Sequence, residues 1–366
     1  MRHQAMRHQA MRRIKWNRRA DIKSSMTRKG IPSGEPWFWN DPGIAGEAIR
    51  YALAPAAIAY GLGQRTRMAF ASPVDVGVPV ICVGAATIGG AGKTPFAIEL
   101  ARVVGERAGE IFFLTRGYGG GEKGPHLCAD DDEASAIGDE AMLLASSRPT
   151  VVAKNRARGA AFAAANGADL IIMDDGHQNP TVAKDASILL VSDDAPQRGP
   201  RRFPAGRYRE ALVDAAARAD IVVAIDEAMP DPIAVGEAYY VRARTTPLTT
   251  PLAPSIAGRR VLAFCGIARP ERFFSTLARL GAETTATIAF PDHHMYSPFE
   301  LNALAENAAS SGAALITTEK DHVRLTKEWR SRIDVLRIRT KIEEQEPFVA
   351  HVMSLVERNR PDWRRA

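Results

Sequence analysis

The segment with the clearest capacity for chemistry is Thr87-Ile-Gly-Gly-Ala-Gly-Lys-Thr94, which lies between an apolar run and a helical pattern. A phosphate-binding loop has the form G-x-x-x-x-G-K-[ST] between a strand and a helix, and only its first glycine is replaced here, by Thr87. In such a loop, backbone N–H groups surround phosphate oxygens, the lysine reaches the β- and γ-phosphates, and the final hydroxyl ligates Mg²⁺. The predicted nucleotide-binding residues are Thr87, Ile88, Gly89, Gly90, Ala91, Gly92, Lys93 and Thr94.

A second apolar run, 170–173, ends in two adjacent acids, Asp174 and Asp175. A carboxylate in this place emerges at the edge of the sheet beside the phosphate loop, where it helps to hold Mg²⁺. We therefore predict Thr94, Asp174 and Asp175 as the metal-binding residues, and the sequence leaves open which acid contacts the ion. The guanine signature N-K-x-D is absent, and its nearest look-alike, Thr318-Glu-Lys-Asp321, has the wrong order. This favours ATP over GTP.

Two further groups of residues suit proton transfer. Asp139 and Glu140 stand at a junction between a loop and a helix, and His293 and His294 lie in a turn between a strand and a helix. Carboxylates and histidines are the usual general acids and bases. Each group also has a structural interpretation, because acids are favourable at a helix N-terminus and histidines are common in solvated turns. The residues alone leave both interpretations open.

The elements that must position these residues form an alternating pattern from residue 78 onwards. Apolar strands are expected at 78–83, 111–114, 151–153, 170–173, 188–191 and 221–225, with helices at 95–105, 139–146 and 156–166. This alternation predicts a parallel sheet covered by helices on both faces. A Pro- and Thr-rich connector at 245–254 leads to a smaller α/β unit. Its expected strands are 261–265, 284–290, 314–317 and 333–338, and its expected helices are 270–280, 298–310 and a closing helix at about 346–357.

Charge and composition exclude several classes of protein. Residues 1–29 hold ten Lys or Arg and one acid, so this tail carries +9 and the remaining chain −3 of the net charge of +6. Because the basic character is confined to the tail, we expect no nucleic-acid partner. With 46% hydrophobic and 25% charged residues, the chain is neither disordered nor a polytopic membrane protein. Its three cysteines form no C-x-x-C pair, so neither a zinc ribbon nor a disulfide framework is indicated.

An apolar segment at 43–63 follows the tail. Glu47 and Arg50 interrupt it, and Pro55 should kink its helix or split it into two. Aromatic residues lead into the segment and Arg65 follows it, as in a helix that lies in a membrane interface. A helix packed on the protein's own core explains the pattern equally well.

Nine short motifs, in order from about Pro36 to the C-terminus, make the chain resemble the tetraacyldisaccharide 4′-kinases, the lipid A 4′-kinases. They are PWFW with the apolar segment, TIGGAGKTP (87–95), TRGYGG (115–120), GDE (138–140), DDGHQN (174–179), PAGRYRE (204–210), GIARPERFF (266–274), PDHH (291–294) and TTEKD (317–321). Threonine in place of the loop's first glycine is typical of that family. The chain departs from the family at His177 and Asn179, where Phe or Leu and His are usual, and at Ala141, where Pro is usual.

The resemblance implies an enzyme that transfers the γ-phosphate of ATP to the 4′-hydroxyl of a tetraacylated glucosamine disaccharide 1-phosphate, giving the 1,4′-bisphosphate lipid A precursor. It also implies Mg²⁺ dependence, a peripheral position on the cytoplasmic face of the inner membrane of a Gram-negative bacterium, and no obligate protein partner. By the same resemblance, Asp139 accepts or orients the proton of the sugar hydroxyl, and His293 is its partner across the cleft. The implied substrate and phosphate residues are Tyr118, Arg156, Arg209 and Glu210.

The expected fold class is therefore α/β: a P-loop NTPase-like parallel sheet flanked by helices, with a second, smaller α/β domain and an N-terminal membrane-associating helix. We expect a basic, disordered tail at 1–35, an interfacial helix at 36–66, a P-loop kinase domain at 67–250 and the smaller domain at 251–366. The alternative function is a regulatory P-loop NTPase of the metallochaperone or partition type. That alternative explains the loop and the acids but leaves the GDE and PDHH motifs without a role. A non-enzymatic membrane-surface module is a third interpretation.

Overall fold

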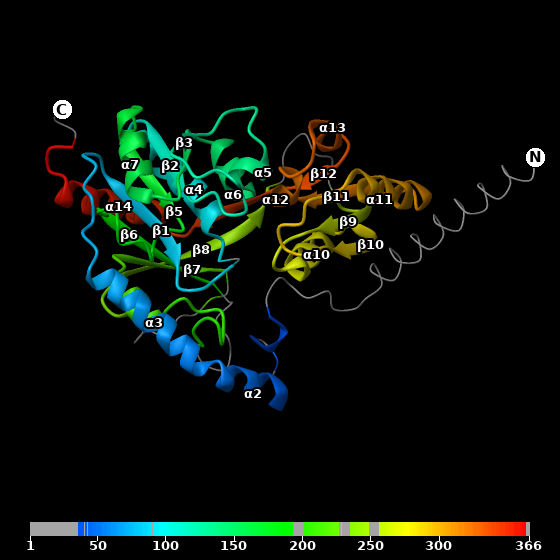
Figure 1. Cartoon of the computed structure of the whole chain (residues 1–366). Helices are drawn as coiled ribbons and strands as arrows, with labels where there is room; N and C mark the ends of the chain where they lie inside the picture. The colour runs from blue at the N-terminus through cyan, green and yellow to red at the C-terminus, as the bar shows by residue number, and fades with distance from the viewer. Residues whose placement is uncertain are drawn as a thin grey trace, which may run out of the picture.

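The chain forms two α/β units, one built on a nine-stranded sheet and the other on a four-stranded sheet (Figure 1). The computed structural model describes residues 36–39, 41, 43–89, 91–192, 201–226, 228, 235–248 and 256–363. The predicted tail at 1–35 and residues 249–254 of the predicted connector lie outside these ranges.

The nine-stranded sheet has the order β13-β8-β7-β6-β1-β5-β2-β4-β3. Its strands are β1 (Val80–Ala85), β2 (Ile111–Thr115), β3 (His126–Leu127), β4 (Thr150–Val152), β5 (Leu170–Asp174), β6 (Ala186–Ser192), β7 (Ile221–Ile225), β8 (Tyr239–Pro247) and β13 (Ile338–Ile342). All neighbours are parallel except at the two edges, where β3 pairs with β4 and β13 with β8 in antiparallel fashion. The predicted parallel sheet is thus confirmed for its centre, and the antiparallel edge strands are additions that the alternating pattern did not reveal.

Helices cover both faces of this sheet, as the buried parallel strands require. They are α4 (Lys93–Ala108), α5 (Ala134–Ile137), α6 (Asp139–Ala145), α7 (Arg156–Ala165), α8 (Leu212–Ala216) and α14 (Gln345–Asn359). Alternate residues of β1 point to opposite faces, so Ile81 and Val83 join the core beneath α4 and α14, while Val80 and Cys82 join the core beneath α7. The central strands are therefore fixed in register by two separate apolar layers.

The smaller sheet has the order β10-β9-β11-β12, and all its strands are parallel. Its elements are β9 (Arg260–Cys265), α10 (Pro270–Arg279), β10 (Glu283–Ala289), α11 (Pro298–Ser310), β11 (Ala314–Thr318), α12 (Glu319–His322), α13 (Lys327–Arg330) and β12 (Asp334–Leu336). The chain then returns to the large unit. The strand expected at 333–338 is divided between β12 and β13, and the expected closing helix, α14, packs into the large core through Phe348 and Val352. The predicted bounds of the smaller domain, 251–366, include both β13 and α14, and this is wrong for both. The pattern of a strand or of an apolar helix face does not show which element it will pack against.

The apolar N-terminal segment forms a short 3₁₀ turn, η1 (Trp37–Trp39), and two helices, α2 (Ile44–Ala52) and α3 (Ala54–Ala69). The break falls at Leu53, and Pro55 lies in the first turn of α3, where its missing N–H costs nothing. The predicted split at Pro55 is thus confirmed. Among the described residues, no helix is long and apolar enough to cross a membrane.

Candidate active site

The phosphate loop connects β1 to α4 at the carboxyl ends of the parallel strands. Lys93 and Thr94 open α4 and are both buried, and Gly92, with a left-handed φ of 74°, is the N-cap residue. This turn directs the free N–H groups of the first helical turn into the loop, which is the arrangement that binds phosphate. Of the predicted loop residues, Gly90 lies outside the described residues, and the others occupy this one turn.

Residues 201–210 form one wall of the phosphate loop. Thr87 makes a β-bridge with Tyr208, and the N–H of Ile88 donates to the carbonyl of Arg207 at 2.8 Å. The N–H of Arg209 donates in turn to the carbonyl of Ala86 at 2.8 Å. The PAGRYRE motif therefore packs directly against the phosphate loop and does not form a separate surface.

Asp174 lies beside the loop because β5 pairs with β1 in a register that sets it opposite Val83. The hydroxyl of Thr94 donates to Asp174 Oδ2 at 3.1 Å, while the buried Oδ1 has no hydrogen-bond partner among the described residues. Burial, and after it the charges of Glu140 and Asp175, raise the pKa of Asp174 to about 7. A buried carboxylate oxygen without a partner beside a hydroxyl fits a hard cation such as Mg²⁺.

Asp175 has a different environment from its neighbour. Both terminal nitrogens of Arg209 donate to its carboxylate, at 2.8 and 2.9 Å, and Lys93 Nζ lies 3.6 Å from Oδ1. Burial opposes ionisation, but these two cations hold the pKa of Asp175 well below its usual range. Asp175 is therefore paired with two cationic side chains, whereas Asp174 has one oxygen that accepts no hydrogen bond from the described residues. Among the described residues, no group of three or more His, Cys, Asp or Glu is arranged to hold a metal ion, so a Mg²⁺ ion here would complete its shell with water or phosphate oxygens.

Asp139 is the first residue of α6, and its side chain is only 3% exposed. Its Oδ1 accepts the N–H of Glu140 at 3.0 Å. Its Oδ2 accepts a hydrogen bond from Arg324 and lies 3.2 Å from Nδ1 of His293. The two motifs whose roles the sequence left open, GDE and PDHH, thus meet in one carboxylate–histidine pair. The glycine before it, Gly138, has a φ of 89°, a backbone conformation that other residues rarely adopt.

The charges around this pair determine its protonation. Burial disfavours the ionised carboxylate, but the hydrogen bond from His293 and the charges of Lys320 and Arg324 hold the pKa of Asp139 well below its usual range. The hydrogen bond to Asp139 raises the pKa of His293, although burial opposes this. The ring of Tyr118 meets the imidazole edge-on, with centroids 5.2 Å apart, and 64% of the Tyr118 residue is exposed.

Glu140 links the pair to the phosphate loop. It accepts a hydrogen bond from Lys320 at 2.7 Å, and α6 lies against α4, the helix that begins with Lys93. The charge of Lys320 lowers the pKa of Glu140. Burial opposes this effect, and the charge of Lys93 adds to it. Glu140 is thus within reach of both Lys93 of the phosphate loop and Lys320 of α12. α6, which carries Glu140, lies beside α12 of the smaller unit (Figure 1).

Sequence reasoning missed three residues of this site. Lys320 lies in the TTEKD motif and Arg324 lies three residues beyond it, and the motif itself assigns neither of them a role. Gln178, inside DDGHQN, donates to the carbonyl of Ala85 at 2.8 Å and to Glu210 at 2.9 Å, and accepts from Arg209 at 3.1 Å. The position of each within a motif was the available signal, but the contacts depend on the packing of distant segments.

The remaining predicted residues occupy different positions. Arg156 is buried at the start of α7 and donates to the carbonyl of Ala153 at 2.7 Å. Burial lowers the pKa of Arg156 to about 10, against the attraction of Asp175 and Asp174 at the end of β5. Glu210 is also buried, and it accepts hydrogen bonds from Gln178 and Arg218. His177, where the chain departs from the family that it resembles, is a core residue bonded to the carbonyl of Ala215 at 2.9 Å.

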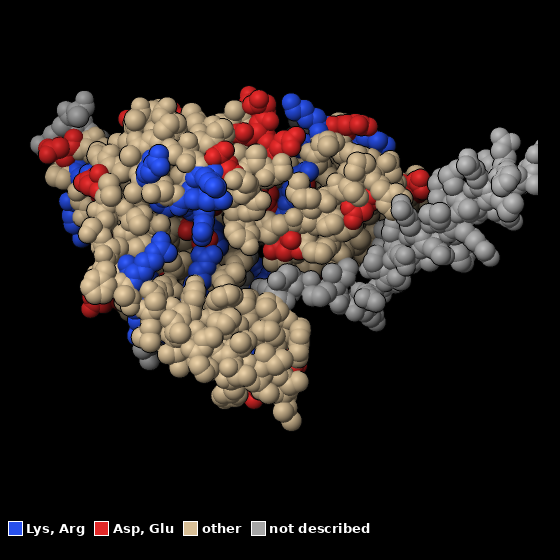
Figure 2. All heavy atoms as spheres, in the orientation of Figure 1, with Lys and Arg blue, Asp and Glu red and all other residues tan. Residues whose placement is uncertain are grey.

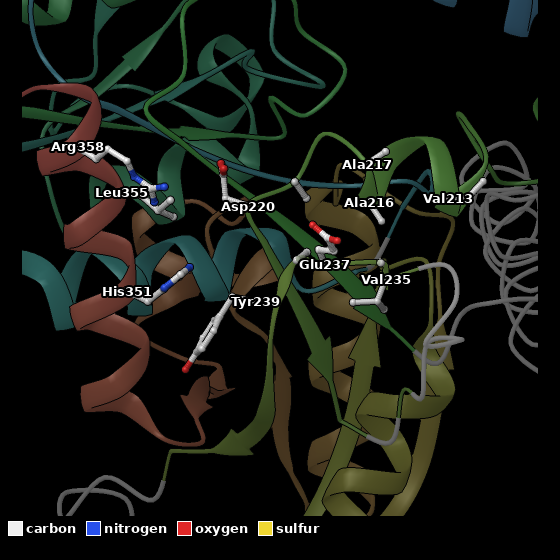
Figure 3. A pocket seen from close by; sticks show the side chains of 13 residues that line it. Val213, Ala216, Ala217, Asp220, Val235, Glu237, Tyr239, His351, Leu355 and Arg358 are labelled. Carbon is white, nitrogen blue, oxygen red and sulfur yellow. The ribbon is translucent and has the colours of Figure 1, made fainter.

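A hollow of about 650 Å³ lies elsewhere, between α8, the start of β8 and α14 (Figure 3). Tyr239 and His351 stack within it, with ring centroids 4.4 Å apart. Its lining residues lie at the amino ends of β7 and β8, whereas P-loop proteins bind nucleotide at the carboxyl ends of their strands. The hollow therefore shares no residue with the site described above.

Comparison with known proteins places this geometry in a family. The sequence profile of the tetraacyldisaccharide-1-P 4′-kinases, LpxK, matches residues 49–357. A tetraacyldisaccharide 4′-kinase of Parvibaculum lavamentivorans is 42% identical over 351 residues, which are 89% of this chain and 99% of that protein. One from Methylorubrum extorquens is 44% identical over 309 residues, 83% of this chain and 93% of that protein.

A solved structure agrees. The crystal structure of LpxK from Aquifex aeolicus, described as an "apo" form in complex with ATP, superimposes with a TM-score of 0.71 at 25% identity. The match covers 84% of this chain and 99% of that one. With the profile over most of the chain, close relatives along nearly their whole length and the same fold, this chain belongs to the tetraacyldisaccharide 1-phosphate 4′-kinase family.

Proposed function

We propose that this protein transfers the γ-phosphate of ATP to the 4′-hydroxyl of a tetraacylated glucosamine disaccharide 1-phosphate. The observation that carries the proposal is the Asp139–His293 pair, assembled at the edge of a phosphate loop by residues from two units. A sugar hydroxyl is a poor nucleophile, and an ionised carboxylate within reach of it can accept its proton as the new bond to phosphorus forms. A regulatory P-loop NTPase has no need of such a pair.

The chain's residues divide the work of transfer. Lys93 and the N–H groups of the loop hold the β- and γ-phosphates, and Thr94 and Asp174 are the residues that would hold Mg²⁺. The ion, when bound, neutralises charge on the phosphates. Asp139 accepts the hydroxyl proton while the bond between the γ-phosphorus and the bridging oxygen breaks. His293 orients that carboxylate, so most of the acceleration comes from positioning and charge.

The substrate residues are proposed from their exposure or from their positions beside the phosphate loop. Tyr118 is mostly exposed beside His293, which suits contact with a sugar ring. Arg209 and Arg156 lie near the acids at the end of β5, where they supply positive charge for phosphate. Glu210 is buried between Gln178 and Arg218, so we propose that it supports the wall of the loop.

We also propose that the protein acts at the cytoplasmic face of the inner membrane through α2 and α3. The apolar stripe of α2, which includes Ile44 and Tyr51, is exposed, and α3 buries only the narrow line of Ala57 and Gly61. Figure 2 shows few charged side chains at the bottom of the view, over α2 and the adjoining part of α3, with Lys and Arg gathered above. A substrate with several acyl chains stays in the bilayer, since each buried CH₂ contributes about 0.8 kcal/mol.

The test is phosphate transfer by the purified protein with Mg²⁺-ATP and the tetraacylated disaccharide 1-phosphate in detergent. We expect a bisphosphorylated lipid with the wild type and at least about a 100-fold lower rate with Asp139→Asn, which keeps the shape but removes the base. Asp132→Asn is the matched control, because it breaks another carboxylate–histidine contact, 2.7 Å from His126, outside the site. ATP hydrolysis without any lipid product in the wild type would exclude the kinase and favour the regulatory NTPase.

A further inference from the structure

Asp139 is held from the other unit by a second group besides His293. Arg324 follows α12 in the smaller unit, and its NH2 donates to Asp139 Oδ2 in the large unit. A parallel contact, Lys320 to Glu140 at 2.7 Å, joins the same two segments. The TTEKD segment and its continuation therefore reach across the boundary to the residues at the start of α6.

Hydrogen bonds on both terminal nitrogens hold the guanidinium of Arg324 in place. Its NH1 donates to Asp321 Oδ1 at 3.0 Å and to the carbonyl of Gly266 at 2.8 Å. Asp321 is fully buried and accepts further hydrogen bonds from Tyr296, at 2.7 Å, and from Thr318, at 2.5 Å. Both terminal nitrogens of the guanidinium are thus engaged, and its planar shape fixes the direction from which NH2 approaches Asp139.

We propose that Arg324 is a positioning residue for the phosphate transfer, which sets the orientation of the Asp139 carboxylate from the opposite unit. The inference rests on the proposed function. The side chain of Arg324 is only 1% exposed, so it acts through Asp139 and does not touch the substrate. Because Arg324 and His293 both lie in the smaller unit, the base is correctly oriented only where the two units are apposed.

The groups around Asp139 define what Arg324 adds. His293 and Arg324 contact its Oδ2, Lys320 acts from α12, and the carboxylate of Glu140 lies next to it on α6. Without Arg324, the carboxylate keeps one direct donor on Oδ2 and loses its closest fixed positive charge. Asp139 then rotates more freely, and it takes up a proton at higher pH than in the wild type.

The experiment compares the wild type with Arg324→Ala and Arg324→Gln in the lipid kinase assay, over a range of pH and with guanidinium ion added. Arg360→Ala is the matched control. Arg360 also binds two carboxylates, Asp75 and Asp185, and it joins the end of α14 to the large sheet away from the site. Melting temperatures are measured for every variant. Arg324→Gln is used to decide the question where Arg324→Ala does not fold.

We expect the Arg324 variants to lower kcat by about 100-fold, with the KM for ATP within about threefold of the wild type. The acid limb of the pH profile should move to higher pH, and guanidinium should restore part of the activity of Arg324→Ala. Arg360→Ala should lower the melting temperature without moving the profile. Unchanged kcat in the Arg324 variants would overturn the proposal, and so would a loss that shows neither the pH shift nor the rescue. If the wild type itself makes no lipid product, it is the proposed function that fails.

Discussion

The exposed apolar face of α2 and α3 leads to a quantitative prediction about membrane binding. The perturbation is the replacement of Ile44, Ile58 and Leu62 by serine. These side chains are 91%, 61% and 58% exposed, so they contribute little to the folded core. We therefore expect the triple variant to fold as the wild type does and to differ only in what its surface can bind.

The magnitude follows from the exposed area. Complete burial of an Ile or Leu side chain contributes about 1.5–3 kcal/mol. The three exposures together amount to about two complete side chains, so their loss weakens insertion by about 3–6 kcal/mol. A change of 1.4 kcal/mol is about tenfold in an equilibrium constant, and the partition coefficient should therefore fall by at least about 100-fold.

The assay is sedimentation with vesicles of phosphatidylethanolamine and phosphatidylglycerol, at about 0.5 M salt to screen the attraction of basic residues to anionic lipid. The control variant replaces Val74, Leu127 and Tyr240, which are exposed at other places, by serine. We expect the wild type and the control to sediment with the vesicles and the α2–α3 variant to stay in solution. If the α2–α3 variant bound within about threefold of the wild type, the apolar face would not be the membrane contact.

Further predictions concern the site. Lys93→Met should weaken ATP binding by about 10–100-fold in a calorimetric titration, because a charge-assisted bond to phosphate is lost. Asp174→Asn should raise the Mg²⁺ concentration needed for half-maximal activity by at least about tenfold. Because Asp139 raises the pKa of His293, their contact stabilises the fold fully below the unfolded-state value of about 6.5, and this contribution is lost as the pH rises through the folded value. The difference in melting temperature between wild type and His293→Ala should thus shrink from about pH 6 to about pH 9. Gly138→Ala should lower the melting temperature, since φ is 89° and a Cβ would lie 2.4 Å from a carbonyl oxygen, a strain of about 1–3 kcal/mol.

The local parts of the site could be predicted because they depend on short stretches of chain. A strand, a glycine turn and a helix beginning at Lys93 identify a phosphate loop, and acids after a buried strand such as β5 emerge at the same edge. Pro55 likewise predicts the break between α2 and α3, because a proline is tolerated in the first turn of a helix but not in its interior. Other expectations failed for a common reason. The local sequence of β13 and α14 does not show which sheet they pack against, and both belong to the large unit.

The division between Asp174 and Asp175 shows what only packing decides. The two acids are adjacent and chemically identical, but Arg209 and Lys93 contact Asp175, while Asp174 Oδ1 has no hydrogen-bond partner in the described part of the chain. The cation that each carboxylate meets comes from segments distant in sequence. No spacing rule predicts that assignment.

The sequence by itself determined the α/β fold class and the phosphate loop, because residue type and local periodicity express these directly. It also supplied a carboxylate and a histidine of the types used in proton transfer, but the residues alone left their role open. The tertiary structure decided that His293 and Arg324 of the smaller unit converge on one carboxylate oxygen of Asp139 in the large unit. It also decided that the apolar stripe of α2 faces outward instead of into the core. Both outcomes depend on which surfaces pack together, and that is a property of the whole chain rather than of any segment.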